Sequence, residues 1–101
     1  MRLIDRVIWG FACHMIGDYV LQSDFIAKTK GENWYHMIVH CVLYCVPFVV
    51  VFGLTEHIAF LFATHVVIDS AKARWDAIDY CGDQMLHYKA ILLCLAVGMG
   101  V

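Results

Sequence analysis

The chain has 101 residues, of which 62% are hydrophobic and 16% charged, and its formal net charge at pH 7 is −2. A chain this short cannot bury so much apolar surface inside a water-soluble globule, since soluble domains have about 45–50% apolar and about 25% charged residues. The charge balance excludes a basic surface for nucleic acid. We therefore expect one domain, residues 1–101, in a lipid bilayer, and no nucleic-acid partner.

Apolar stretches predict four helices, over about residues 3–22, 34–53, 57–75 and from 83 to the C-terminus. The second is the best transmembrane candidate, because about 20 residues cross the hydrocarbon core, and Pro47 is expected to kink it. The connector 23–33 is predicted to be a polar loop with a short interfacial helix, and 73–82 an interfacial segment with aromatic anchors. The expected fold is all-α, a polytopic membrane four-helix bundle with interfacial connector segments.

Basic residues predict the orientation of this bundle. The first and third connectors lie at one end of an alternating bundle and carry Lys28, Lys30, Lys72 and Arg74. The positive-inside rule makes that end cytoplasmic and puts both termini on the other side of a bacterial inner membrane, although Arg2 and Arg6 weigh against this. The fourth helix is short for a complete span, which leaves three alternatives open: it spans alone, it tilts, or a homo-oligomer completes it.

Metal-capable side chains recur in pairs four residues apart, a spacing that puts both members on one helix face. The pairs are His14/Asp18, His36/His40, His65/Asp69 and Asp83/His87. In an alternating bundle, the ends of the first and third helices meet the starts of the second and fourth. At 1.5 Å per residue, the pairs then share one layer roughly 5–12 Å inside the cytoplasmic face. Inward imidazoles and carboxylates are how helix bundles hold metals.

The pairs lead to assigned roles. The predicted metal ligands are His14, Asp18, His40, His65, Asp69 and His87. These exceed the three or four donors of one tetrahedral site, so we expect a dinuclear centre, with zinc first and manganese or iron as alternatives. Residues predicted to orient the ligands are Gln22, Gln84 and His36. Asp83 is predicted as the general base, and Lys72 either binds an anionic substrate group or extends to the interface.

A purely structural interpretation competes with the metal centre. In it, Asp18 and Asp69 form ion pairs with histidines or with Lys72, and the polar layer only holds the bundle together.

The same residues resemble a known family over about residues 10–90. The pattern is His14, Asp18 and Gln22 at four-residue spacing, then Asp24, His40, His65, Asp69, Lys72 and the sequence Asp83-Gln84-x-x-His87. It is similar to the DUF3307-type family of small, uncharacterised integral membrane proteins from bacteria and phages. That family is distantly similar to prophage membrane proteins described as metal-dependent hydrolases. The resemblance implies that His14, Asp18, Gln22, His40, His65, Asp69, Asp83, Gln84 and His87 serve a metal centre.

Three functions are compatible with the sequence. The leading hypothesis is a membrane-embedded metal-dependent hydrolase that acts on a phosphoester or lipid headgroup at the cytoplasmic interface. The alternative is a non-enzymatic phage or host membrane protein, active in partner binding, exclusion or anti-defence, whose polar cluster is structural. A transporter of metal or protons is a third hypothesis, but the far halves of the second and fourth helices lack the polar groups that it needs.

Overall fold

The computed structural model describes residues 1–101 and contains helices without strands. The elements are α1 (Leu3–Met15), the π-helical turn η1 (Ile16–Val20), α2 (Asp24–Thr29), α3 (Trp34–Phe52), α4 (Glu56–Ala73) and α5 (Tyr80–Ala96). The prediction of an all-α fold is confirmed, and the four long helical segments lie close to the predicted ranges. The short helix expected in the first connector is α2.

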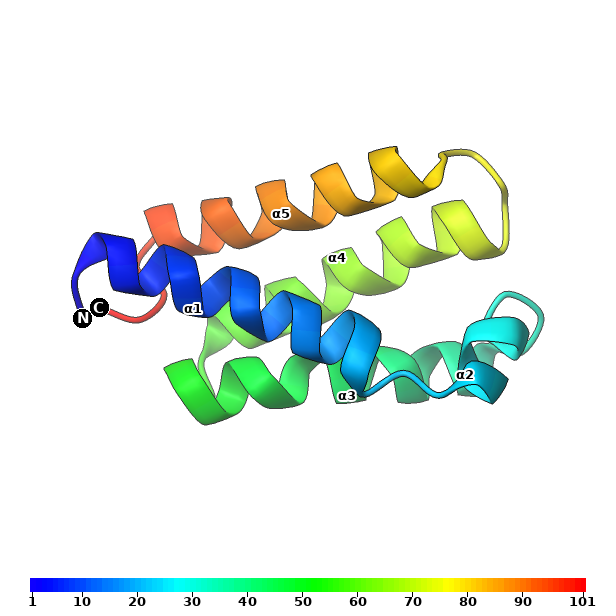
Figure 1. Ribbon diagram of the computed structural model, residues 1–101, viewed down its shortest axis with the longest axis horizontal. Helices are drawn as coiled ribbons and strands as arrows, with labels where there is room; N and C mark the ends of the chain where they lie inside the picture. The colour runs from blue at the N-terminus through cyan, green and yellow to red at the C-terminus, as the bar shows by residue number, and fades with distance from the viewer.

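The four long helices form a bundle in which consecutive helices run in opposite directions (Figure 1). Helix α3 packs on α4 and α4 on α5, while α1 packs on both α3 and α5, so α1 lies diagonally across from α4. Both termini lie at one end, and α2 and the α4–α5 connector lie at the other (Figure 1). The ends of α1 and α4 therefore meet the starts of α3 and α5, as the shared polar layer requires.

Side-chain caps fix where the helices begin. The Asn33 side-chain oxygen accepts a hydrogen bond from the backbone of His36 at 3.2 Å, at the start of α3. Asp79 accepts one from the backbone of Gly82 at 2.7 Å and so starts α5 at Tyr80, three residues before the predicted start. Helix α3 continues through Pro47, the residue expected to kink it.

A tight turn ends α5. The Met99 amide donates to the Cys94 carbonyl at 2.9 Å and the Gly98 amide to the Leu95 carbonyl at 3.3 Å. Gly98 has a φ of +105°, the left-handed conformation that this helix ending needs and that glycine adopts without strain. The buried Arg6 guanidinium donates to the Met99 carbonyl at 2.9 Å and also to that of Leu95, so α1 holds the end of α5 in place.

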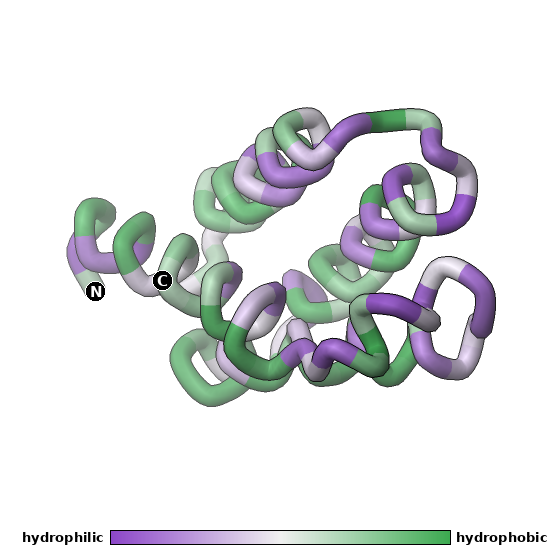
Figure 2. Tube along the Cα trace, turned by 45° about the vertical axis from the view of Figure 1, so that its right-hand side comes forward, coloured by the Kyte–Doolittle hydropathy of each residue, from purple (hydrophilic) through white to green (hydrophobic).

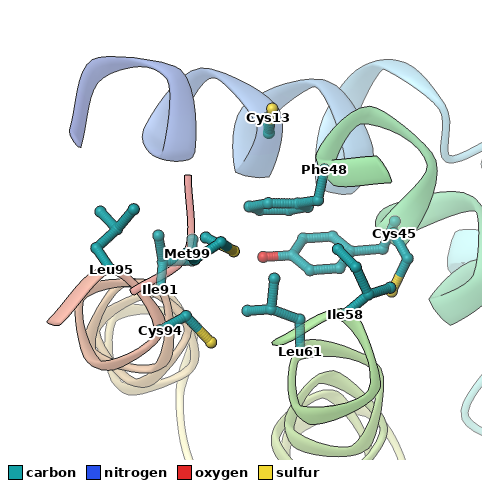
Figure 3. Packing of buried hydrophobic residues seen from close by; sticks show 10 residues of the cluster. Cys13, Cys45, Phe48, Ile58, Leu61, Ile91, Cys94, Leu95 and Met99 are labelled. Atoms are coloured by element: carbon teal, nitrogen blue, oxygen red, sulfur yellow. The ribbon is translucent and has the colours of Figure 1, made fainter. Parts of the chain in front are cut away.

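The half of the bundle nearest the termini has an apolar core. Side chains from all four long helices and the C-terminal turn meet there (Figure 3), namely Cys13, Tyr44, Cys45, Phe48, Ile58, Leu61, Ile91, Cys94, Leu95 and Met99. Hydrophilic segments gather at the opposite end, around α2 and the α4–α5 connector (Figure 2). The bundle is thus divided along its length into an apolar half and a polar half.

Polar and charged side chains make up a large share of the buried residues, and many large hydrophobic side chains are exposed. Ten of the 25 buried residues are polar or charged, whereas large hydrophobic side chains such as Val20, Val50 and Leu54 are more than 70% exposed. Charged groups are rarely fully buried in soluble proteins unless they are paired. By length and composition alone, one helix, α3, is long and apolar enough to cross a membrane.

Candidate metal centre

Three donor atoms from three helical elements converge in the polar half. Asp18 Oδ1 lies 3.4 Å from His40 Nε2 and 3.7 Å from His65 Nε2, and the two Nε2 atoms are 2.9 Å apart. Ligands about 2.0–2.1 Å from a tetrahedral zinc ion lie about 3.3 Å from each other. All three side chains are buried. This Asp/His/His group could hold a metal ion.

A fourth possible donor atom, a carboxylate oxygen of Asp69, borders the group but has another partner. Asp69 Oδ2 lies 3.1 Å from His40 Nε2 and 4.0 Å from His65 Nε2. The same oxygen is 2.7 Å from the ammonium of Lys30, a buried lysine. Gln22 accepts a hydrogen bond from that ammonium at 2.7 Å. Asp69 is therefore shared between the imidazoles on one side and a lysine on the other.

Gln84 connects Asp18 to the remaining polar residues. Its amide nitrogen donates at 3.0 Å to Asp18 Oδ2, the oxygen that faces away from the Asp/His/His group, and at 3.0 Å to Asp83 Oδ2. Its amide oxygen is 2.8 Å from His14 Nε2, whose other ring nitrogen is 2.8 Å from the Tyr44 hydroxyl. These contacts fix the orientation of the Asp18 carboxylate, as outer groups do around metal ligands.

Stacked rings hold the imidazoles in position. The His65 ring stacks on Tyr44 with a centroid separation of 3.7 Å and on His87 with one of 4.2 Å. His87 Nε2 lies 3.3 Å from Asp83 Oδ1. His65 therefore packs against two flat neighbours, which restrict the rotation of its ring while its Nε2 lies 2.9 Å from that of His40.

The π-helical turn carries Asp18 into the group. The Leu21 amide donates to the Ile16 carbonyl, five residues earlier, at 3.0 Å. Within the turn, a Cβ atom on Gly17 would lie 2.7 Å from the Tyr44 carbonyl oxygen, so only glycine permits this approach to α3. Such turns frequently occur at functional sites. Here the turn brings the Asp18 carboxylate next to the imidazoles of α3 and α4.

The buried charges of the layer do not balance. Three carboxylates, Asp18, Asp69 and Asp83, are buried with one ammonium, that of Lys30. With neutral histidines the layer carries a formal charge of −2. Uncompensated charge in a low-dielectric interior is costly. A divalent cation or two protonated imidazoles would balance it.

Comparison with known families supplies one match. Residues 7–100 match the family described as a protein of unknown function (DUF3307). The chain belongs to the DUF3307 family. Neither the curated proteins nor the solved structures contain a significant match to it.

In this member of the DUF3307 family, the six predicted ligands are all buried in the polar half, but they form one three-donor group rather than two. Asp18, His40 and His65 make up that group. Asp69 is paired with Lys30, and the remaining predicted ligands contact Gln84, Tyr44 and Asp83. The expectation of a dinuclear centre rested on the number of donors alone. In the structure, hydrogen bonds and an ion pair engage three of the six predicted ligands.

Two residues predicted to serve the site have other contacts. His36 Nδ1 is 2.6 Å from the Thr29 hydroxyl, so this ring packs against α2 rather than against a predicted ligand. The Lys72 ammonium lies 5.4 Å from the centre of the Tyr80 ring at the end of the bundle. His36 and Lys72 lie on the helices predicted for them. They lie in the first turn of α3 and the last turn of α4, where their side chains contact α2 and the first residue of α5, respectively.

Two residues that contact the polar cluster, Tyr44 and Lys30, were not predicted as part of the site. Tyr44 follows His40 by one turn and so extends the same face of α3, a signal that was present. Lys30 lies in a connector without periodic pattern, and its burial depends on how that connector folds back on the bundle.

The cavities of the molecule lie away from the group. The largest, about 520 Å³, lies between α3 and α4 and is lined by apolar residues from Val42 to Phe62. The second is bounded by α4 and α5 near His57, and the third lies along α4 from Phe60 to Ile68. None is lined by a predicted site residue.

Proposed function

We propose that this protein is a multi-pass protein of the bacterial inner membrane that holds one divalent metal ion, zinc in the first instance, at Asp18, His40 and His65. The observation that carries the proposal is the convergence of three buried donors with separations of 2.9–3.7 Å, close to the spacing around tetrahedral zinc. A +2 ion would also balance the formal charge of −2 in the layer. Imidazole and carboxylate suit manganese or iron as well, so metal analysis decides the identity.

Membrane insertion is supported by the exposed hydrophobic side chains, by the buried charged groups and by the ends of the bundle. The bundle is 39 Å long, enough for the about 30 Å hydrocarbon core, and α3 has the length and composition of a span. Exposed aromatic rings at the polar end, such as Trp34, Trp75 and Tyr80, are typical of the membrane interface. The basic connectors favour a cytoplasmic position for that end.

The activity that we propose for the centre is hydrolysis of a phosphoester or lipid headgroup. Three protein ligands leave one coordination position, as catalytic zinc sites do, and a divalent ion supplies Lewis acidity there. Asp69, 3.1 Å from His40, is nearer to the group than the general base predicted from sequence, Asp83. Asp69 lies about 6 Å from the end of α4 by helical rise, a depth near the headgroups.

A non-enzymatic role is the second candidate, and burial favours it. The most exposed member of the Asp/His/His group, Asp18, is 8% exposed, and no cavity reaches the group. A metal in such a closed site, or two protonated histidines, would stabilise a bundle whose outer faces bind a membrane partner.

Elemental mass spectrometry of detergent-purified protein tests the metal site. We expect about one equivalent of zinc, manganese or iron per chain in the wild type, and its loss in His40→Ala and His65→Ala. His36→Ala is the matched control, because this histidine lies one turn from His40 but contacts Thr29, and it should retain the metal. A folded, metal-free wild type would refute the proposal.

The same preparations separate the two candidate functions. Metal-loaded wild type is assayed with phosphomonoesters, phosphodiesters and phospholipid vesicles, beside His65→Ala. Turnover that is lost in the variant supports the hydrolase. A metal-loaded protein that turns over none of these substrates supports the non-enzymatic role.

A further inference from the structure

Lys30 is the one buried lysine, with 6% of its surface exposed, and it lies beside the Asp/His/His group. Its ammonium contacts two oxygens, Asp69 Oδ2 at 2.7 Å and Gln22 Oε1 at 2.7 Å. A buried ammonium is costly unless it is paired, so this side chain has a fixed partner rather than a solvated surface position.

The backbone holds Lys30 at this point. Its amide donates to the Ile26 carbonyl at 2.9 Å, which closes the last turn of α2. The next residue, Gly31, lies so close to the Ala73 carbonyl of α4 that a Cβ atom would overlap it. The connector is therefore pressed against the end of α4, and the lysine enters the bundle one turn beyond Asp69.

The oxygen held by Lys30 is also close to two of the three donors of the Asp/His/His group. Asp69 Oδ2 lies 3.1 Å from His40 Nε2 and 4.0 Å from His65 Nε2, similar to the separations within the three-donor group. A carboxylate oxygen can direct its charge to the ammonium or to a metal at that distance, and the two cations compete for it.

We propose that Lys30 keeps Asp69 out of the metal's first coordination sphere and so reserves the fourth position for water or a small anion. This inference rests on the proposed metal site and deepens it. Lys30 is a positioning residue, since it acts through Asp69. Without it, the same three helical elements, η1, α3 and α4, would supply Asp18, His40, His65 and Asp69 as a closed structural site. With it, the fourth position accepts an external ligand, and the nearby ammonium favours an anionic one such as a phosphoryl oxygen.

Cobalt(II) substitution in the detergent-purified full chain tests the proposal, because the visible spectrum of cobalt reports its ligands without any assay of activity. We expect azide to change the wild-type spectrum. In Lys30→Met the azide response should be lost, and the dissociation constant for the metal should fall about tenfold, the scale on which outer groups alter metal affinity. Lys28→Met, an exposed lysine of the same connector, is the matched control and should resemble the wild type.

Two further variants cover the effects of charge and of folding. Lys30→Met/Asp69→Asn removes both charges and the competing ligand, and should regain the azide response. Lys30→Gln keeps a hydrogen-bond donor at this position and replaces Lys30→Met if the latter does not fold; it should also lose the azide response.

The failures are distinguishable. A wild type that takes up no cobalt overturns the metal site together with this inference. Cobalt uptake without any azide response, or an unchanged azide response and affinity in the folded variant that lacks Lys30, overturns this inference alone.

Discussion

At the scale of single residues, the imidazoles of His40 and His65 make the strongest case for a cation. Their Nε2 atoms face each other at 2.9 Å, and only one hydrogen fits between them. His40 Nε2 also has carboxylate oxygens of Asp18 and Asp69 at 3.4 and 3.1 Å. One ring nitrogen carries at most one proton and cannot donate to all three neighbours. Asp18, His40 and His65 would hold a metal ion with both Nε2 lone pairs and one carboxylate, and the ion would supply the missing positive charge.

Gln84 provides a test of how the ligands are oriented. Gln84→Leu removes the amide that donates to Asp18 at 3.0 Å, and leaves a side chain of similar size. We expect the metal dissociation constant to rise about tenfold, because the Asp18 carboxylate is then free to rotate. Competition with a chromogenic chelator measures it. The exposed neighbour Met85, replaced by leucine, serves as the control, and equal affinities in both variants would contradict this role for Gln84.

At the scale of elements, the sequence predicts the helices whose side chains follow a periodic pattern. Pairs four residues apart identified the helix faces of His14, His40 and His65, because that spacing is local and survives packing. The alternation of helix direction follows from short connectors. Both expectations agree with the helices and their order in the structure.

Elements without a period could not be predicted. The π-helical turn at Ile16–Val20 adds one residue to a helical turn, and it depends on the contact between Gly17 and α3. The entry of Lys30 depends on the close approach of Gly31 to α4. Both the π-helical turn and the position of Lys30 depend on contacts between residues far apart in the sequence, so no pattern within one segment predicts them.

Gly17 tests the importance of the π-helical turn. In Gly17→Ala the new methyl group would lie 2.7 Å from the Tyr44 carbonyl oxygen, a backbone atom that cannot rotate away. We expect the turn to separate from α3, with a loss of about 1–3 kcal/mol in the free energy of unfolding and a loss of metal. Gly10→Ala is the comparison, since its methyl group would meet side chains only, Ile91 at 3.0 Å and Leu95 at 3.6 Å. Thermal unfolding and metal analysis of both variants check this, and a larger effect at Gly10 would speak against it.

At the scale of the whole molecule, the two halves of the bundle perform different tasks. The apolar half holds the helices together around the Phe48 region and is closed by Arg6 at the C-terminal turn. The polar half is rich in costly buried groups and gains stability only if they are balanced. Because the same four helices run through both halves, the apolar half fixes the helix positions that bring Asp18, His40 and His65 together.

The proposed membrane orientation can be measured with the cysteines of the chain, because the two halves of the bundle differ in exposed thiols. Cys81 is exposed near the start of α5, at the polar end, whereas the other cysteines are buried: Cys13, Cys41, Cys45 and Cys94. A membrane-impermeant maleimide should therefore label Cys81 alone. If the polar end is cytoplasmic, Cys81 reacts in inside-out vesicles and not in intact cells.

In Cys81→Ser/Leu54→Cys the thiol lies in the α3–α4 connector at the opposite end, where Leu54 is 81% exposed, and the pattern should reverse. Labelling of both sites from one side would mean that the bundle does not cross the bilayer. A reversed pattern at both sites would keep the span but invert the orientation, which would make Arg2 and Arg6 the basic residues that determine it.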